Sequence, residues 1–82
     1  GHPMSRLLLG NMYYQGQGVD KDYTRAHLWW RFAEDLNING ARQNIVMLEK
    51  KMSDEERYKT KELYKMCMKN TLYNCIKKID KM

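Results

Sequence analysis

The stretch that decides the fold is the run DYTRAHLWWRFA at residues 22–33. Four of its residues are spaced at i, i+3, i+4 and i+7, which is one face of an α-helix: Ala26, Trp29, Trp30 and Ala33. Asp22 is a good N-cap for this helix, because its carboxylate can accept a free backbone N–H of the first turn. We expect the helix to stop at Asn37, a residue that tolerates left-handed backbone angles at helix ends.

Helical spacing continues towards both ends of the chain. On the N-terminal side, an apolar stripe is formed by Leu8, Leu9, Met12 and Tyr13. It runs up to Gly16-Gln17-Gly18, where two glycines release the backbone from helical angles. On the C-terminal side, a third helix is expected from about Gly40. Its apolar stripe is formed by Ala41, Ile45, Leu48 and Met52.

A fourth helix and a short fifth helix are expected in the last third of the sequence. Residues 53–56, Ser-Asp-Glu-Glu, match the S-x-x-E capping box, in which two side chains satisfy backbone donors reciprocally. The helix that follows should turn four residues inwards: Thr60, Leu63, Tyr64 and Cys67. After a break at Asn70-Thr71, the fifth helix is expected from about Leu72 to Ile79. No β-strand pattern is found, so the sequence predicts an all-α fold.

Length, composition and charge narrow the class of protein. With 82 residues, of which 43% are hydrophobic and 30% charged, the chain reads as one small folded domain rather than a disordered tail. No apolar run approaches the roughly 20 residues of a membrane helix, so no membrane insertion is expected. The net charge of +5 lies wholly in residues 42–82, which hold eleven basic and six acidic residues. Such a basic half is either a solvated surface or a site for an acidic partner.

The first residues are interpreted as processing or cloning sequence. Gly1-His2-Pro3 stands before Met4 like the remainder of a cloning site, so residues 1–3 are left out of the predicted fold. Leu7-Leu8-Leu9 is too short for the apolar segment of a secretory signal peptide.

A set of small, apolar and aromatic residues stands at fixed offsets in the first half of the chain: Leu9, Gly10, Met12, Tyr13, Gly16, Gly18, Val19, Asp22, Tyr23, Ala26, Trp29, Ala33 and Ala41. This pattern resembles the Sel1-like repeat, a relative of the tetratricopeptide (TPR) repeat. Residues 41–44 and 52–55 are similar to the closing helices of bacterial Sel1-like proteins. The resemblance implies a short α-solenoid of antiparallel helix pairs. It divides the chain into the repeat (4–40), a second helix pair that caps it (41–69), and a short basic helix and tail (70–82).

Three positions of the pattern also have a direct physical reason. Gly10 and Ala26 are small because two antiparallel helices must approach closely where they cross. Trp29 offers a large apolar face with one N–H, which suits a position between stacked helix pairs.

Cys67 and Cys75 are candidates for a disulfide bond. On one continuous helix they would lie about 12 Å apart at ~1.5 Å rise per residue, whereas a disulfide needs Cα atoms closer than about 7 Å. The pair can therefore bond only if the chain turns between them, at residues 69–71. The closing helices that this segment resembles often carry such a pair. A disulfide implies a periplasmic or secreted protein, and the alternative is two partly buried thiols in a cytoplasmic protein.

No catalytic or metal-binding constellation is found in the sequence, so we predict neither an enzyme nor a cofactor. His27 has no second histidine at metal-ligand spacing and is interpreted as an ordinary surface or edge residue. The Gly16-x-Gly18 pair lacks the third glycine, the preceding strand and the lysine of a phosphate loop. The cysteine spacing is not that of a thioredoxin-like motif.

The resemblance implies a bacterial scaffold or adaptor that acts by protein–protein interaction, often in connection with the envelope or secretion. An immunity protein that neutralises a secreted toxin is a variant of this prediction. The predicted partner contacts are Tyr14, Gln17, His27, Trp30 and Arg31. Neighbours on a helix lie about 100° apart, so Tyr13 and Trp29 are expected inside and Tyr14 and Trp30 at least partly accessible.

Two other interpretations stay open, and both rank below an unidentified protein partner. The lysine-rich C-terminal part can bind nucleic acid or an anionic surface weakly, although no recognition motif accompanies its lysines. The chain can also be the capped end of a longer array. Leu7 and Leu8 on an incompletely covered first helix would then lead to self-association.

Overall fold

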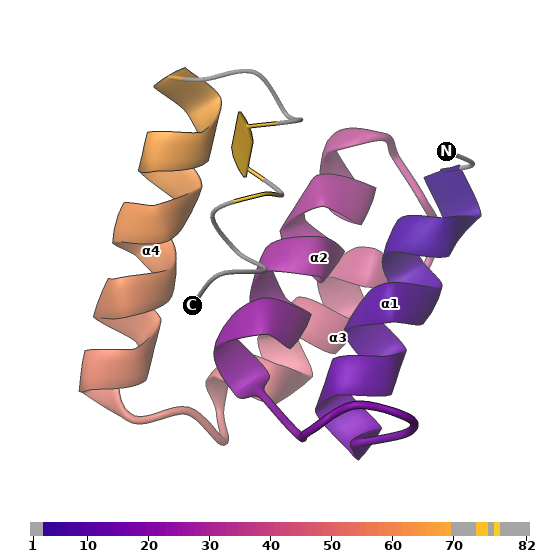
Figure 1. Cartoon of the computed structure of the whole chain (residues 1–82), viewed down its shortest axis with the longest axis horizontal. Helices are drawn as coiled ribbons and strands as arrows, with labels where there is room; N and C mark the ends of the chain where they lie inside the picture. The colour runs from indigo at the N-terminus through magenta and orange to yellow at the C-terminus, as the bar shows by residue number, and fades with distance from the viewer. Residues whose placement is uncertain (1–2, 70–73, 76, 78–82) are drawn as a thin grey trace.

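Four α-helices make up the computed structural model of the chain, which describes residues 3–69, 74, 75 and 77 (Figure 1). In chain order they are α1 (Pro3–Gln15), α2 (Tyr23–Asp35), α3 (Ala41–Glu49) and α4 (Asp54–Lys69). No strand occurs among the described residues, so the predicted all-α fold is confirmed. Most of the predicted fifth helix lies outside the described residues. The three of its residues that are described, Asn74, Cys75 and Lys77, are helical.

Local hydrogen bonds start α2 and α4 where the sequence predicted. The Asp22 carboxylate accepts a hydrogen bond from the backbone N–H of Arg25 at 3.1 Å, which caps α2. At α4 the Ser53 hydroxyl accepts from the Glu56 backbone N–H at 3.1 Å. The Glu56 carboxylate in turn accepts from the Ser53 backbone N–H at 3.0 Å. Both the N-cap and the capping box are confirmed.

The connection between α2 and α3 depends on two left-handed residues. Asn37 has a φ angle of 59° two residues after the end of α2, as its side chain predicted. Gly40 has a φ angle of 91° and stands at the N-cap position of α3. Only glycine adopts that angle without steric cost, so Gly40 allows the chain to turn into α3.

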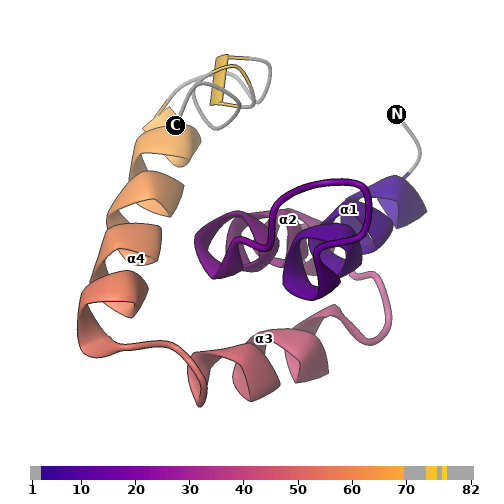
Figure 2. The same ribbon diagram turned by 60° about the horizontal axis from the view of Figure 1, so that its bottom comes forward.

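The central helix of the structure is α2, which contacts each of the other three helices (Figure 2). It runs antiparallel to α1, with α3 and α4 on its other sides (Figures 1 and 2). Two clusters of buried residues surround it. The first cluster contains Leu28, Trp29, Phe32, Cys67 and Cys75. The second cluster contains Ala26, Trp30, Ile45, Leu48 and Met52. The further division into solenoid units stays a prediction.

The expectation that Trp30 is accessible is wrong. Its side chain is only 1% exposed, and its indole Nε1–H donates a hydrogen bond to the backbone carbonyl of Leu7 at 3.2 Å. The expectation assumed that one face of α2 is buried, whereas α2 has neighbours on three sides. Trp29 therefore enters the first cluster and Trp30 the second, although they are adjacent. Trp29 is buried and Tyr14 half-buried, as predicted, whereas Tyr13, which was expected inside, is half-buried and packs against both clusters.

Gly10 is small for the predicted reason, because it lies where α1 crosses α2. A Cβ atom built on Gly10 would overlap the indole ring of Trp30. A ring in that position is part of the core, so the glycine and the tryptophan depend on each other for space.

A disulfide joins Cys67 at the end of α4 to Cys75, whose Cα atoms lie 4.9 Å apart. Helix α4 ends at Lys69, before Cys75 is reached, so the chain turns between the two cysteines as the prediction required. Both sulfur-bearing residues are buried in the first cluster beside Trp29 and Phe32. The bond therefore attaches the segment after α4 to the core.

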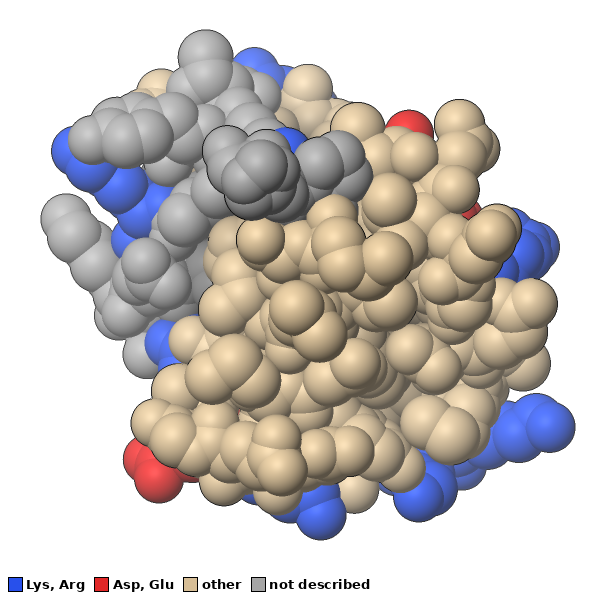
Figure 3. All heavy atoms as spheres, turned by 90° about the vertical axis from the view of Figure 1, so that its right-hand side faces the viewer, with Lys and Arg blue, Asp and Glu red and all other residues tan. Residues whose placement is uncertain are grey.

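Charged residues are distributed unevenly over the surface. The side on which α1 lies is largely uncharged, with Lys, Arg, Asp and Glu towards its edge (Figure 3). Helix α1 has a single charged residue, Arg6, and leaves Met4 and Leu8 52% and 54% exposed. Among the described residues, none of the helices combines the length and the apolar character that crossing a membrane requires.

Candidate partner-binding site

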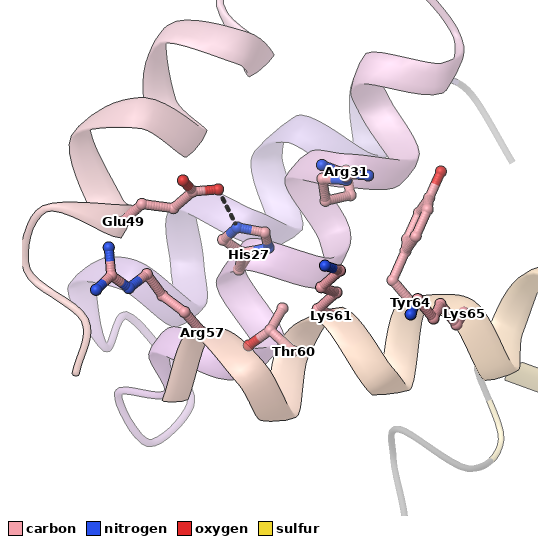
Figure 4. A pocket seen from close by; sticks show the side chains of 8 residues that line it. All are labelled: His27, Arg31, Glu49, Arg57, Thr60, Lys61, Tyr64 and Lys65. Carbon is pink, nitrogen blue, oxygen red and sulfur yellow. Dashed lines mark hydrogen bonds and ion pairs between the residues drawn. The ribbon is translucent and has the colours of Figure 1, made fainter. Parts of the chain in front are cut away.

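A pocket of about 450 Å³ opens beside α2, where α3 and α4 approach it (Figure 4). Its walls come from three helices, and most of its side chains are charged. Helix α2 supplies His27 and Arg31, and α3 supplies Glu49. Helix α4 supplies the remaining five lining residues, which are Arg57, Thr60, Lys61, Tyr64 and Lys65.

The spacing of the sequence explains how α4 lines the pocket. Arg57, Lys61 and Lys65 are four residues apart, so they form one row along the helix. Thr60 lies on the adjoining inner face, where it is fully buried and donates its hydroxyl to the backbone carbonyl of Glu56 at 2.8 Å. The capping box at Ser53 fixes where α4 begins, and so which face carries this row.

His27 lines the pocket and is only 7% exposed. Its Nε2 lies 3.0 Å from the Glu49 Oε1 (Figure 4). Because an ionised carboxylate only accepts hydrogen bonds, Nε2 carries the proton and Nδ1 is the bare nitrogen of the neutral ring. Nδ1 is buried and has no hydrogen-bond partner in the described part of the chain. The interpretation of His27 as a surface or edge residue is wrong, because α2 is enclosed by its neighbours.

The charge state of His27 reflects this environment. Burial lowers the pKa of His27 below its usual value of 6.5, and the positive charge of Arg31 acts in the same direction. The hydrogen bond and negative charge of Glu49 oppose that change without reversing it. The imidazole is therefore neutral at pH 7.

Arg31 and Tyr64 form the opposite end of the pocket. The Arg31 guanidinium lies over the Tyr64 ring, 4.4 Å from its centroid. The Tyr64 hydroxyl donates a hydrogen bond to the Asp35 carboxylate at 2.6 Å. Burial, and then that hydrogen bond, raise the pKa of Tyr64, so the phenol stays protonated. Arg31 is thus held by stacking, and it forms no ion pair with a carboxylate of the described residues.

Positive charge exceeds negative charge around the pocket. Four cationic side chains line it against one carboxylate, that of Glu49. Arg57 pairs with Asp54, and Lys65 lies 3.8 Å from Glu62, but such exposed pairs contribute little. Lys61 forms no ion pair within the described ranges. The pocket therefore presents a positive field to any group that enters it.

The structure separates the five predicted contacts. His27 and Arg31 meet in the pocket, one turn apart on α2. Tyr14 lies elsewhere, stacked on Tyr23 and accepting a hydrogen bond from the Lys51 ammonium at 2.6 Å. Gln17 is exposed in the loop between α1 and α2, and buried Trp30 lines no part of the surface.

Several pocket residues were missed by the sequence reasoning. They are Glu49, Arg57, Thr60, Lys61, Tyr64 and Lys65. The spacing of the three basic residues on α4 is a signal that was available. The approach of Glu49 to His27, 22 residues apart, has no local signal. Within the described ranges, no three His, Cys, Asp or Glu side chains are grouped closely enough to hold a metal ion.

The lowered pKa of His27 predicts how stability depends on pH. At a pH between the pKa of His27 in the folded protein and its higher pKa in the unfolded protein, the unfolded chain binds more protons than the folded one. The free energy of unfolding therefore falls as pH drops below about 6.5. We expect urea unfolding midpoints to be lower at pH 5 than at pH 7.5. The variant His27→Gln should lose most of this dependence, because its amide can still donate to Glu49 but does not titrate. An equal pH slope in both proteins would contradict the assignment.

The sequence was compared with models of protein families, with curated proteins and with solved structures, and none of the three comparisons gave a match. The resemblance to Sel1-like repeats therefore rests on the residues that carry it and stays a prediction.

Proposed function

We propose that this protein is a non-catalytic interaction module that binds acidic side chains of another protein in the pocket between α2 and α4. The observation that carries the proposal is the convergence of Arg31, Arg57, Lys61 and Lys65 on one concave site with a single carboxylate. Two of these cations, Arg31 and Lys61, are not engaged by a carboxylate of the described residues. They are available to a partner without breaking an ion pair.

The composition of the pocket favours a protein partner over a small metabolite. Tyr64, with Arg31 stacked on it, adds an aromatic surface to the charged rim, and aromatic and arginine side chains are typical of interface centres. Complementary charge raises the association rate and rejects basic partners, which is what an adaptor needs to select its target.

The setting follows from the resemblance and the disulfide. Sel1-like proteins are bacterial scaffolds or adaptors, often of the envelope or of secretion systems, and this chain is proposed to act in that way. The disulfide between Cys67 and Cys75 favours an oxidising compartment, periplasmic or extracellular. An immunity protein is one form of this function, in which the acidic partner is a toxin.

Charge reversal in the pocket tests the proposal. The probe is a fluorescent peptide with four glutamates, compared with the same peptide carrying glutamines. We expect Lys61→Glu combined with Lys65→Glu to weaken binding of the glutamate peptide by about tenfold or more, a change of roughly 1.4 kcal/mol. Circular dichroism checks that helicity is retained.

A matched control is available on the same helix. Lys59 and Lys69 are exposed on α4 and do not line the pocket. Lys59→Glu with Lys69→Glu changes the net charge equally and should weaken binding much less. Equal losses in the two variants would show that only overall charge matters. Tighter binding of a DNA duplex than of the peptide, with a steep salt dependence, would favour the nucleic-acid alternative.

A further inference from the structure

We infer that the group held in this pocket is a carboxylate, and that its capture loads one proton onto His27, so that binding and protonation are coupled. The inference rests on the proposed function and adds to it the chemistry of the ligand and its regulation by pH.

The hydrogen bonds of His27 leave one place for the proton. Nε2 already carries a hydrogen, which it donates to Glu49 at 3.0 Å. Nδ1 is the remaining basic atom, and it is buried without a partner in the described residues. Figure 4 shows this nitrogen on the side of the ring that faces the α4 residues Thr60 and Lys61. A proton there makes the imidazole a cation that is paired with Glu49 on its other edge.

Burial is the largest effect that keeps the proton off His27 while the pocket is empty. The positive charge of Arg31 on α2 also opposes a positive ring, and the α4 cations Arg57, Lys61 and Lys65 line the same pocket. Glu49 on α3 and Glu34 on α2 favour a positive ring. Burial and the charge of Arg31 together outweigh these two carboxylates, so the ring is neutral.

A bound carboxylate changes this balance. It neutralises cations beside His27 and adds a negative charge of its own, and both effects favour the imidazolium. An opposite charge within about 4–6 Å raises a pKa by roughly 1–3 units. By thermodynamic reciprocity, a proton on His27 must then strengthen carboxylate binding by the same factor.

The geometry of Arg31 selects a planar anion. Its guanidinium lies over the Tyr64 ring, 4.4 Å from the centroid, and presents a planar fork of N–H groups. A carboxylate can accept two parallel hydrogen bonds from such a fork. Lys61 is exposed on a flexible stem and is free of carboxylate partners in the described chain, so it can complete the contact from α4.

Calorimetry of the full chain with the glutamate peptide tests the coupling. The glutamates stay ionised between pH 5.5 and pH 8, and with the N-terminus of the peptide acetylated any pH dependence in that range comes from the protein. We expect proton uptake, measured as different binding enthalpies in two buffers of unequal ionisation enthalpy. The affinity should rise up to tenfold from pH 8 to pH 5.5 for each pKa unit gained.

Variants separate His27 from other groups. His27→Gln should bind the peptide with no proton uptake, and His2→Gln, which changes the other histidine of the chain, should behave as the unaltered protein. Glu49→Gln is the second test if His27→Gln does not fold, and it should reduce the uptake. Peptide binding without uptake and with a flat pH profile would overturn the coupling and leave the proposed function standing. No binding of the peptide at any pH would overturn both.

Discussion

Replacement of Trp30 by alanine is expected to lower the free energy of unfolding by about 3–5 kcal/mol. The side chain is 1% exposed and fills the cluster between α1, α2 and α3, so its removal leaves a cavity as well as a loss of buried apolar surface. It also removes the hydrogen bond to the Leu7 carbonyl. Small domains are stable by only about 5–15 kcal/mol, so the variant should be close to unfolding at 37 °C.

Urea unfolding followed by circular dichroism measures the effect, and Gly10 provides its control. Gly10→Ala alone should cost about 1–3 kcal/mol, because the new methyl group conflicts with the Trp30 indole. In the Trp30→Ala background most of that cost should disappear, since the methyl group enters the vacated space. Additive effects of the two substitutions, or a loss below about 1 kcal/mol for Trp30→Ala, would show that Trp30 is not the core residue described above.

Removal of the disulfide should give the second large effect. The bond closes a short loop, with a sequence separation of 8 between Cys67 and Cys75. Loop-closure entropy then predicts a loss of about 2–3 kcal/mol for Cys67→Ser combined with Cys75→Ser. Because both residues are buried beside Trp29, the loss should be accompanied by a change in tryptophan fluorescence.

The reductant is the built-in control for this variant. Dithiothreitol should lower the urea midpoint of the unaltered protein and leave that of the double serine variant unchanged. Identical midpoints for the oxidised, reduced and serine forms would show that the bond does not stabilise the fold. A mass increase of two hydrogens on reduction reports the oxidised starting state.

The helix boundaries could be predicted because their causes are local. Asp22 caps α2 by a bond to a residue three positions away, and Ser53 and Glu56 satisfy each other over the same distance. Asn37 takes its left-handed angle from its own side-chain chemistry. The disulfide candidate is confirmed as well, and its condition, that Cys67 and Cys75 do not share one continuous helix, follows from the rise of a helix alone.

The candidate site could be predicted only in part. Arg31 was named from the sequence, and so was His27, although as a surface residue. The pocket that they share also needs residues from other helices, which the helical periodicity of the sequence does not reveal. Tyr64 comes to Arg31 from 33 residues away, and Glu49 comes to His27 from 22 residues away. Such pairings arise from the angles at which whole helices pack.

By itself, then, the sequence determined the helical class, the caps at which α2 and α4 begin, and the condition under which the two cysteines can bond. Only the tertiary structure decided that α2 is enclosed, that Trp30 and His27 are inside, and that cations of two helices face one carboxylate. The physical reason is the separation along the sequence between the residues that interact. A cap or a turn is satisfied within a few residues, whereas the burial of a side chain depends on how many helices surround its own. The 3.6-residue period is the same in a helix covered on one side and in a helix covered on three.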